Sequence, residues 1–294
     1  MKEKLLIFFN KHQFLKKIFR PVYKILHAFF SFVKLYIFFM LQGLFRLIFL
    51  RGNSNFQKLK KLHNVNKGKR CFIIATGPSL RKEDVEKLCK NKEYTIGVNS
   101  IFKLYETLKY KPSYYVCADD DYVKQLLKET NNSFFDNKAD IYSFTDLSVK
   151  KRNVKYSENL LFIPYNRLLH SYKTFLDYHF LFSLNPIFGL FDYYTVTALA
   201  INLAAYMGFS EIYLLGVDCN YMGKTMHANG IETGLEHIAT DDNKIYAAYS
   251  MQKGYEYLHK KLLHYGINVY NATRGGALEV FPRVSFDDLI GINK

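Results

Sequence analysis

Short apolar runs alternate with longer amphipathic stretches from residue 70 to the end of the chain. Six runs are almost continuously apolar, as in strands of a parallel sheet covered on both faces. They span 71–75, 94–99, 114–118, 160–164, 212–217 and 268–271. Helical periodicity predicts helices at 82–90, 101–108, 122–129, 195–207 and 244–265. This alternation predicts an α/β fold with a Rossmann-like, doubly wound and mainly parallel sheet.

Two stretches of this body do not fit the alternation. Residues 131–155 are polar and rich in turn formers. Residues 220–243 follow a predicted strand and contain three glycines and two histidines. A long glycine-containing loop after a parallel strand is a common position for an active-site lid, so we predict a lid insertion at 220–243.

Residues 1–50 are dense in Phe, Leu and Ile, but basic residues interrupt them at short intervals. The longest lightly charged run, 35–50, is shorter than the roughly 20 apolar residues of a membrane-spanning helix. We therefore expect one or two amphipathic helices that lie in the membrane interface, with Pro21 ending the first. A helical appendage packed on the body or on a partner subunit, and a single span, are the alternatives. Residues 51–69 are polar and predict a linker or short helix leading into a catalytic domain at 70–294.

The positive charge is concentrated in the same part of the chain. Residues 1–61 contain 13 Lys or Arg and one acidic residue, so they hold +12 of the net charge of +15. The body has no evident basic stripe or nucleic-acid-binding motif, which favours an anionic membrane surface over nucleic acid as the partner. The four cysteines include no CxxC pair, which is typical of reduced thiols rather than of disulfides or a zinc site.

The first predicted strand runs directly into the turn Thr76-Gly77-Pro78-Ser79. A tight strand-to-helix turn presents backbone N–H groups to a phosphate, and the helix N-terminus adds partial positive charge. An ordinary strand–helix turn has the same spacing, so the turn alone does not identify a ligand.

Three aspartates, 119 to 121, follow the third predicted strand. Carboxylates at this position would hold Mg²⁺ on a nucleotide diphosphate, with Asp119 and Asp121 as the ligands. The alternative is that they begin the next helix, where acidic side chains satisfy free backbone N–H groups.

Several motifs occur together, and in the same order, in two related groups of proteins. The runs CFIIATGPSL, GVNS, YYVCAD and EIYLLGVD and the tail GGALEVFPRVSFDDL carry a resemblance that covers residues 68–290. One group is the bacterial CMP-sialic-acid-dependent sialyltransferases. The other is the family of MptE-like 6-hydroxymethylpterin diphosphokinases, which includes motility-associated flagellin glycosyltransferases. The resemblance implies a nucleotide-dependent transferase with a Rossmann-like fold.

The sialyltransferase resemblance also implies site residues, most of which fall at the carboxyl ends of predicted strands. Those enzymes usually carry Asn where this chain has Thr76. For Asn99 the alternative is a turn-forming role. The implied nucleotide-binding residues are Thr76, Gly77, Pro78, Ser79, Asn99, Asp119, Thr195, Val196, Thr197 and Tyr221.

The catalytic base is harder to identify. The family's catalytic histidine aligns near 241–249, where this chain has none. His227 and His237, inside the expected lid, are the candidates, because an imidazole with a pKa near 6.5 suits a general base. Either one can equally be an exposed bystander. We also expect a catalytic role for Asp218, which ends the strand leading into the lid.

Together these features predict a glycosyltransferase. It would move sialic acid, Kdo or a related nonulosonate from a CMP-activated nucleotide sugar to a lipid-linked or lipopolysaccharide-type glycan. A CMP-sugar requires no cofactor, and Mg²⁺ would serve only if the two aspartates bind it. We expect peripheral attachment to the cytoplasmic face of the bacterial inner membrane. An MptE-like pyrophosphokinase using Mg-ATP and a non-catalytic scaffold are the alternatives, and the oligomeric state is open.

Overall fold

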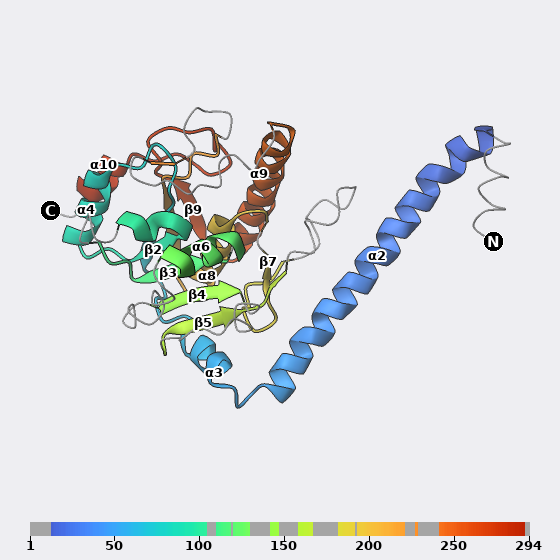
Figure 1. Ribbon diagram of the computed structural model, residues 1–294, viewed down its shortest axis with the longest axis horizontal. Coiled ribbons are helices and arrows are strands. Elements are labelled where there is room, and N and C mark those ends of the chain that lie inside the picture. Colours follow the sequence, from blue (N-terminus) through green and yellow to red (C-terminus); the bar gives the residue numbers. More distant parts are fainter. Residues whose placement is uncertain are drawn as a thin grey trace.

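A seven-stranded sheet forms the centre of the molecule, in the order β5-β4-β3-β2-β1-β8-β9, with every neighbouring pair parallel (Figure 1). The computed structural model describes residues 13–104, 110–118, 120–129, 142–146, 158–166, 182–191, 193–220, 227–228 and 241–291. The strands are β1 (Arg70–Ile74), β2 (Thr95–Val98), β3 (Tyr114–Cys117), β4 (Tyr142–Asp146), β5 (Leu160–Ile163), β8 (Glu211–Leu215) and β9 (Asn268–Asn271). The predicted α/β fold class is confirmed.

Helices cover both faces of the sheet, and side chains that alternate along each strand form two separate cores. In β1, Cys71 and Ile73 belong to the first core, whereas Phe72 and Ile74 belong to the second. The first core includes residues of α3 (Ser54–Lys61), α8 (Val196–Tyr206) and α9 (Asp241–His264). The second includes residues of α4 (Lys82–Lys90), the 3-10 helix η1 (Asn99–Leu104), α6 (Asp120–Glu129) and α10 (Phe286–Gly291). Two buried faces explain why most of these strands are almost continuously apolar.

The chain extends the sheet outward from β1 to β5 and then returns to the other side of β1 with β8. The strand order therefore reverses between β1 and β8. In sheets of this kind, ligands bind outside the carboxyl ends of the strands at such a switch point. A pair of two-residue strands, β6 (Tyr165–Asn166) and β7 (Leu190–Phe191), lies outside this sheet.

The structure differs from the sequence prediction at two places in the body. The polar stretch 131–155, which did not fit the alternation, contains β4, paired with β3 and β5. Phe144 of this strand is buried, but the strand is too short and polar to show an apolar run. The helix expected from residue 244 begins at Asp241, so the last three residues of the expected lid are helical. Of the rest of that lid, only residues 220, 227 and 228 are described.

Residues 54–68, expected as part of a linker, are packed into the body. In α3, Phe56 and Leu59 are buried in the first core. The backbone N–H groups of Asn64, Asn66 and Gly68 then donate to carbonyl oxygens at the end of α8, at 3.1, 2.8 and 3.0 Å. These bonds satisfy carbonyl groups that a helix end leaves without partners. The segment is therefore an integral part of the fold.

The N-terminal segment forms one helix, α2 (Gln13–Phe49), which extends away from the sheet (Figure 1). It continues through Pro21, so the expectation that this proline separates two helices is wrong. Proline removes one helical hydrogen bond but does not always end a helix. Near its carboxyl end α2 contacts the body, where Phe39 packs on Phe191 and the Arg46 guanidinium donates to the Phe188 carbonyl at 2.7 Å. None of the helices in the described ranges has the length and hydropathy that a membrane crossing needs.

The packing of α3 leads to a stability prediction. Leu59→Ala removes a side chain with 0% exposure from the first core, so we expect the free energy of unfolding to fall by about 2–5 kcal/mol. Lys61→Ala, on the exposed side of the same helix, should change it by less than about 0.5 kcal/mol. Urea unfolding of both variants tests this, and equal stabilities would show that α3 does not belong to the core.

Candidate functional site

The turn after β1 lies directly against the loop after β8. The Gly77 N–H donates to the Gly216 carbonyl at 2.8 Å. A Cβ atom on Gly77 would overlap both that carbonyl oxygen and the Asp218 carboxylate. Only glycine therefore allows the two loops to approach this closely.

Asp218 joins the same two loops through its side chain. Its Oδ2 accepts hydrogen bonds from the Ser79 hydroxyl at 2.8 Å and from the Ser79 N–H at 3.3 Å. The loop after β9 supports Asp218 from behind, because the Ala277 N–H donates to its carbonyl at 2.6 Å. Arg283 holds that loop by donating to the carbonyls of Gly275 and Gly276 at 2.9 and 3.2 Å. We expected a phosphate contact from Ser79, but both of its donors point to Asp218 and it does not line the cavity described next.

A cavity of about 380 Å³ opens at the carboxyl ends of β1, β2, β3 and β8. Its volume is within the range of about 300–1,000 Å³ that is usual for small-ligand sites. It lies at the switch point between β1 and β8, as expected for this class of sheet. Nine of the sequence-predicted residues line it: Thr76, Gly77, Pro78, Asn99, Thr195, Val196, Thr197, Asp218 and His227.

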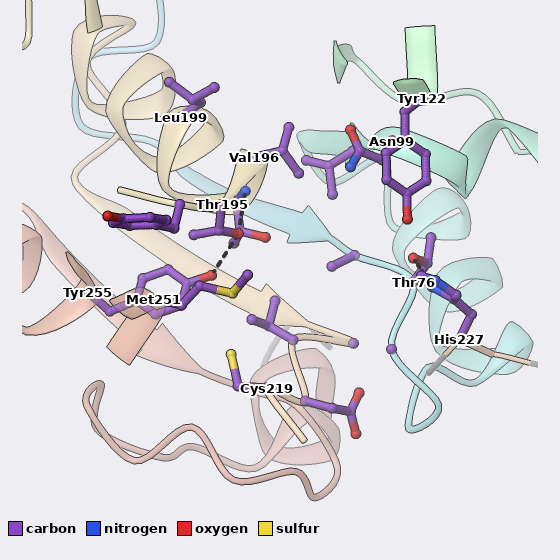
Figure 2. A pocket seen from close by; sticks show the side chains of 18 of the residues that line it. Thr76, Asn99, Tyr122, Thr195, Val196, Leu199, Cys219, His227, Met251 and Tyr255 are labelled. Carbon is purple, nitrogen blue, oxygen red and sulfur yellow. Dashed lines mark hydrogen bonds between the residues drawn. The ribbon is translucent and has the colours of Figure 1, made fainter. Parts of the chain in front are cut away.

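The amino end of α8 forms one wall of this cavity. The helix begins after Thr195, whose hydroxyl accepts a hydrogen bond from the Thr197 N–H at 3.2 Å. That hydroxyl also lies 3.3 Å from the Tyr255 hydroxyl of α9, on the side of the cavity opposite Asn99 in Figure 2. A helix N-terminus carries a partial charge of about +0.5, so this wall attracts anions.

Asn99 presents an unused acceptor at the cavity. Its backbone has φ 44°, a left-handed conformation that Asn tolerates better than most residues. The Tyr115 hydroxyl fixes this turn by donating to the Asn99 carbonyl at 2.7 Å. The side-chain Oδ1 is buried and makes no hydrogen bond with any described residue. A buried acceptor of this kind costs about 1–3 kcal/mol unless a ligand or water donates to it.

His227 is brought to the same end of the sheet. Its Nδ1 lies 3.0 Å from the Thr76 hydroxyl, and the next residue, Ala228, donates its N–H to the Thr76 carbonyl at 2.8 Å. Figure 2 shows His227 and Thr76 beside each other at one side of the cavity. The other candidate base, His237, lies outside the described residues, as do Tyr221, Asp119 and the side chain of Asp121.

The cavity also contains residues that sequence reasoning missed. Tyr122, Tyr194 and Tyr255 line it, and nothing in the sequence distinguishes them among 24 tyrosines. Cys219 lines it too, but burial, followed by the nearby Asp218 charge, raises the pKa of its thiol to about 12. A thiol with that pKa is protonated at neutral pH and is a poor nucleophile.

The described part of the cavity lining has little charge. Asp218 and His227 are the only members of the Asp, Glu, His, Lys and Arg residue types in it. Within the described ranges, no group of three or more His, Cys, Asp or Glu residues is placed to hold a metal ion. The expected Mg²⁺ site at Asp119 and Asp121 stays a prediction, since their side chains lie outside these ranges.

The contact between the two loops can be tested with glycine variants. Gly77→Ala should lower the free energy of unfolding by about 1–3 kcal/mol, because the new methyl group forces the β1 and β8 loops apart. In Gly52→Ala the added Cβ meets no atom within 4 Å, so this variant should match the wild type to within about 0.5 kcal/mol. Urea unfolding measures both, and a wild-type stability for Gly77→Ala would contradict the close approach.

Comparison with known proteins places the chain in a family. The sequence profile of the family described as 6-hydroxymethylpterin diphosphokinase MptE-like matches residues 49–224, more than half of the chain. No curated protein matches the chain significantly.

Three solved structures are similar in fold. The MAf glycosyltransferase from Magnetospirillum magneticum AMB-1 shares 17% identity with a TM-score of 0.47. The match covers 76% of this chain and 35% of that chain, so the present chain spans about a third of the length of the MAf protein. The sialyltransferase CstII from Campylobacter jejuni, solved with cytidine-5'-monophosphate, shares 16% identity with a TM-score of 0.36, over 74% of this chain and 85% of that chain. The monofunctional alpha-2,3-sialyltransferase Cst-I from the same organism shares 14% identity with a TM-score of 0.33. The match covers 74% of this chain and 81% of that chain. At these identities the likeness concerns the fold. The family profile decides the assignment: this chain belongs to the 6-hydroxymethylpterin diphosphokinase MptE-like family.

Proposed function

We propose that the protein is a glycosyltransferase that moves sialic acid, Kdo or a related nonulosonate from a CMP-activated donor to a membrane-linked surface glycan. The observation that carries the proposal is the convergence of three features on one cavity of about 380 Å³. These features are the N-terminus of α8, the unused acceptor of Asn99, and the imidazole of His227. The choice of CMP follows from the sequence resemblance to CMP-sialic-acid-dependent enzymes.

The charge of the cavity favours a donor with a single phosphate. The described lining offers hydroxyl groups, backbone N–H groups and the partial positive charge of the α8 N-terminus. Besides its sugar carboxylate, a CMP-activated nonulosonate carries one phosphodiester charge, which the partial charge of the helix N-terminus offsets in part. The four negative charges of ATP would need additional cations. The proposed donor does not require an Mg²⁺ ion, and a site for one at Asp119 and Asp121 stays a prediction.

The nucleoside would lie between the carboxyl end of β2 and the amino end of α6. Val98, Ala118 and Tyr122 give this part of the cavity apolar and aromatic walls, which suit the flat face of a base. The buried Oδ1 of Asn99 would accept a hydrogen bond from an amino group of the base or from a ribose hydroxyl. Placing the base here leaves the phosphate beside the amino end of α8.

In the proposed reaction an acceptor hydroxyl oxygen forms a bond to the anomeric carbon, while the bond from that carbon to the phosphate oxygen breaks. His227 takes the acceptor proton, and its contact with Thr76 fixes the orientation of the imidazole ring. CMP leaves with the bonding electrons, and the α8 N-terminus stabilises the charge that develops on its phosphate. Asp218 lines the cavity and holds the two loops in place through Ser79, and its expected catalytic role stays a prediction.

A ligand panel tests the binding part of this proposal. CMP should raise the melting temperature of the protein more than UDP, GDP or ATP do, each measured with and without Mg²⁺, because ligand binding to the native state stabilises it. CMP release from CMP-sialic acid or CMP-Kdo, with and without a lipid-linked acceptor, then tests turnover. The absence of binding to any nucleotide or nucleotide sugar would refute the proposal.

The role of His227 has a separate test. His227→Ala should lower the rate of CMP release by about 10²–10⁴-fold and leave CMP affinity nearly unchanged, because a general base acts on the proton and not on the nucleotide. The matched control is His264→Ala, at an exposed histidine near the end of α9. A full rate in the His227 variant would move the role of base to the undescribed His237 or to another residue.

A second candidate is favoured by the family assignment. A 6-hydroxymethylpterin pyrophosphokinase would transfer a diphosphate from Mg-ATP to the pterin hydroxyl and release AMP. Formation of AMP that depends on a hydroxymethylpterin, together with stabilisation by ATP and Mg²⁺ but not by CMP, would establish this function instead of glycosyl transfer.

A further inference from the structure

A second and larger hollow lies at the opposite end of the strands from the cavity that we propose binds the nucleotide. It measures about 1070 Å³ and is bordered by the carboxyl end of α2, by α3, by the loop before β7 and by the end of α8. The α8 helix connects the two sites, because its first residues line the cavity and Ala205 and Tyr206 line this hollow. At 1.5 Å per residue the helix separates them by about 15 Å.

The hollow combines positive charge with apolar walls. Of the described residues that line it, Arg46, Arg51 and Lys60 are cationic and none is Asp or Glu. Leu47, Ile48, Leu50, Phe56 and Ile187 supply apolar surface, and we call the whole hollow the basic groove.

Arg46 has an unusual position in the basic groove. Its guanidinium donates to two neutral oxygens, the Phe188 carbonyl at 2.7 Å and the Gln42 side-chain oxygen at 3.2 Å. Partial burial lowers the pKa of Arg46, because removal from water disfavours its charged form. An anion in the groove would supply a counter-charge that the described lining lacks.

The basic groove continues into an exposed face of α2. Leu26, Phe30, Ile37, Leu41, Leu44 and Ile48 are 43–66% exposed and follow one another at intervals of three, four or seven residues. With 3.6 residues per turn, this spacing places them on one side of the helix, and we call them the apolar stripe. Phe39, Gly43 and Arg46, which contact the body, lie on the opposite side. Ile48 belongs to both the stripe and the groove.

We propose that the basic groove and the apolar stripe together bind the surface of an anionic membrane. In this arrangement lipid phosphates occupy the groove beside Arg46, Arg51 and Lys60, and the stripe lies among the acyl chains. Figure 1 shows α2 extending clear of the sheet, so the body does not cover the stripe. The proposed nucleotide cavity lies at the carboxyl ends of the strands and is not part of this surface.

Charge favours an anionic membrane over a second copy of the chain as the partner of this surface. Residues 1–61 carry a net charge of +12, so two copies of α2 packed along their stripes would repel each other. Anionic lipids attract the same segment, and each basic residue near such a surface strengthens binding about fivefold. The proposal does not depend on the glycosyltransferase function, because its test involves no substrate.

Vesicle flotation with the full chain tests the proposal. The wild type should bind phosphatidylcholine vesicles that contain phosphatidylglycerol and should bind pure phosphatidylcholine vesicles much more weakly. Arg51→Glu combined with Lys60→Glu should lower binding to the anionic vesicles on the order of 25-fold or more, since two favourable charges are removed and reversed. Ile37→Ser combined with Leu41→Ser should lower binding to them by ~tenfold, because the stripe loses apolar area.

The matched control is Lys82→Glu combined with Lys90→Glu, which makes the same change in charge at exposed positions of α4. It should keep wild-type binding, and circular dichroism should show that all variants are folded. Three results would overturn the proposal: no preference of the wild type for anionic vesicles, equal losses in the groove and control variants, or a dimer that ignores vesicles and dissociates when the stripe is changed.

Discussion

The contact between the loops that follow β1 and β8 is the constraint on which the site depends. Gly77 allows the loops to touch, and the Asp218 carboxylate holds them together by accepting both donors of Ser79. The loop after β9, held by Arg283, supports Asp218 from the other side. Three neighbouring strand ends are thereby joined, and the switch-point cavity opens beside this junction. The polar groups of the junction are largely used within the protein, which leaves the α8 N-terminus and Asn99 to meet a ligand.

The α8 helix relates this junction to the N-terminal part of the chain. Ten of its eleven residues are buried, so its position is set by packing on all sides. Its amino end forms one wall of the cavity, and its carboxyl end is held by hydrogen bonds from residues 64, 66 and 68. The segment that follows α2 therefore positions the same helix that we propose holds the nucleotide phosphate. The family profile begins at residue 49 and so includes this segment.

Sequence patterns predicted the features that depend on repeated apolar contacts. Strands buried on both faces produce continuous apolar runs, so β1, β2, β3, β5, β8 and β9 were all predicted. β4 was missed because its five residues, YSFTD, lie in a polar stretch and give no apolar run. The course of α2 through Pro21 was also missed, since a proline predicts a break more often than a continued helix.

The site was predictable only in part, because strand ends follow from topology but side-chain partners do not. Gly77 and Asn99 lie at the ends of predicted strands and Thr195 at the start of a predicted helix, and the structure brings them to one cavity. The pairing of Ser79 with Asp218 joins residues 139 positions apart, and no local pattern reveals it. Tyr255 reaches the cavity from α9 only because that helix packs on α8. The basic groove likewise brings together residues from five stretches of the chain, 46–51, 56–64, 184–187, 205–206 and 265–267.

The central claim is that the switch-point cavity, with the β1 turn and the α8 N-terminus as its walls, binds a nucleotide. Hydrogen–deuterium exchange of the full chain with and without CMP tests it most directly. The account predicts slower amide exchange in residues 75–80, 195–200 and 216–220 when CMP is bound, with no change in residues 51–64 around the basic groove. Slowed exchange at the basic groove alone, or no change anywhere at saturating CMP, would contradict it.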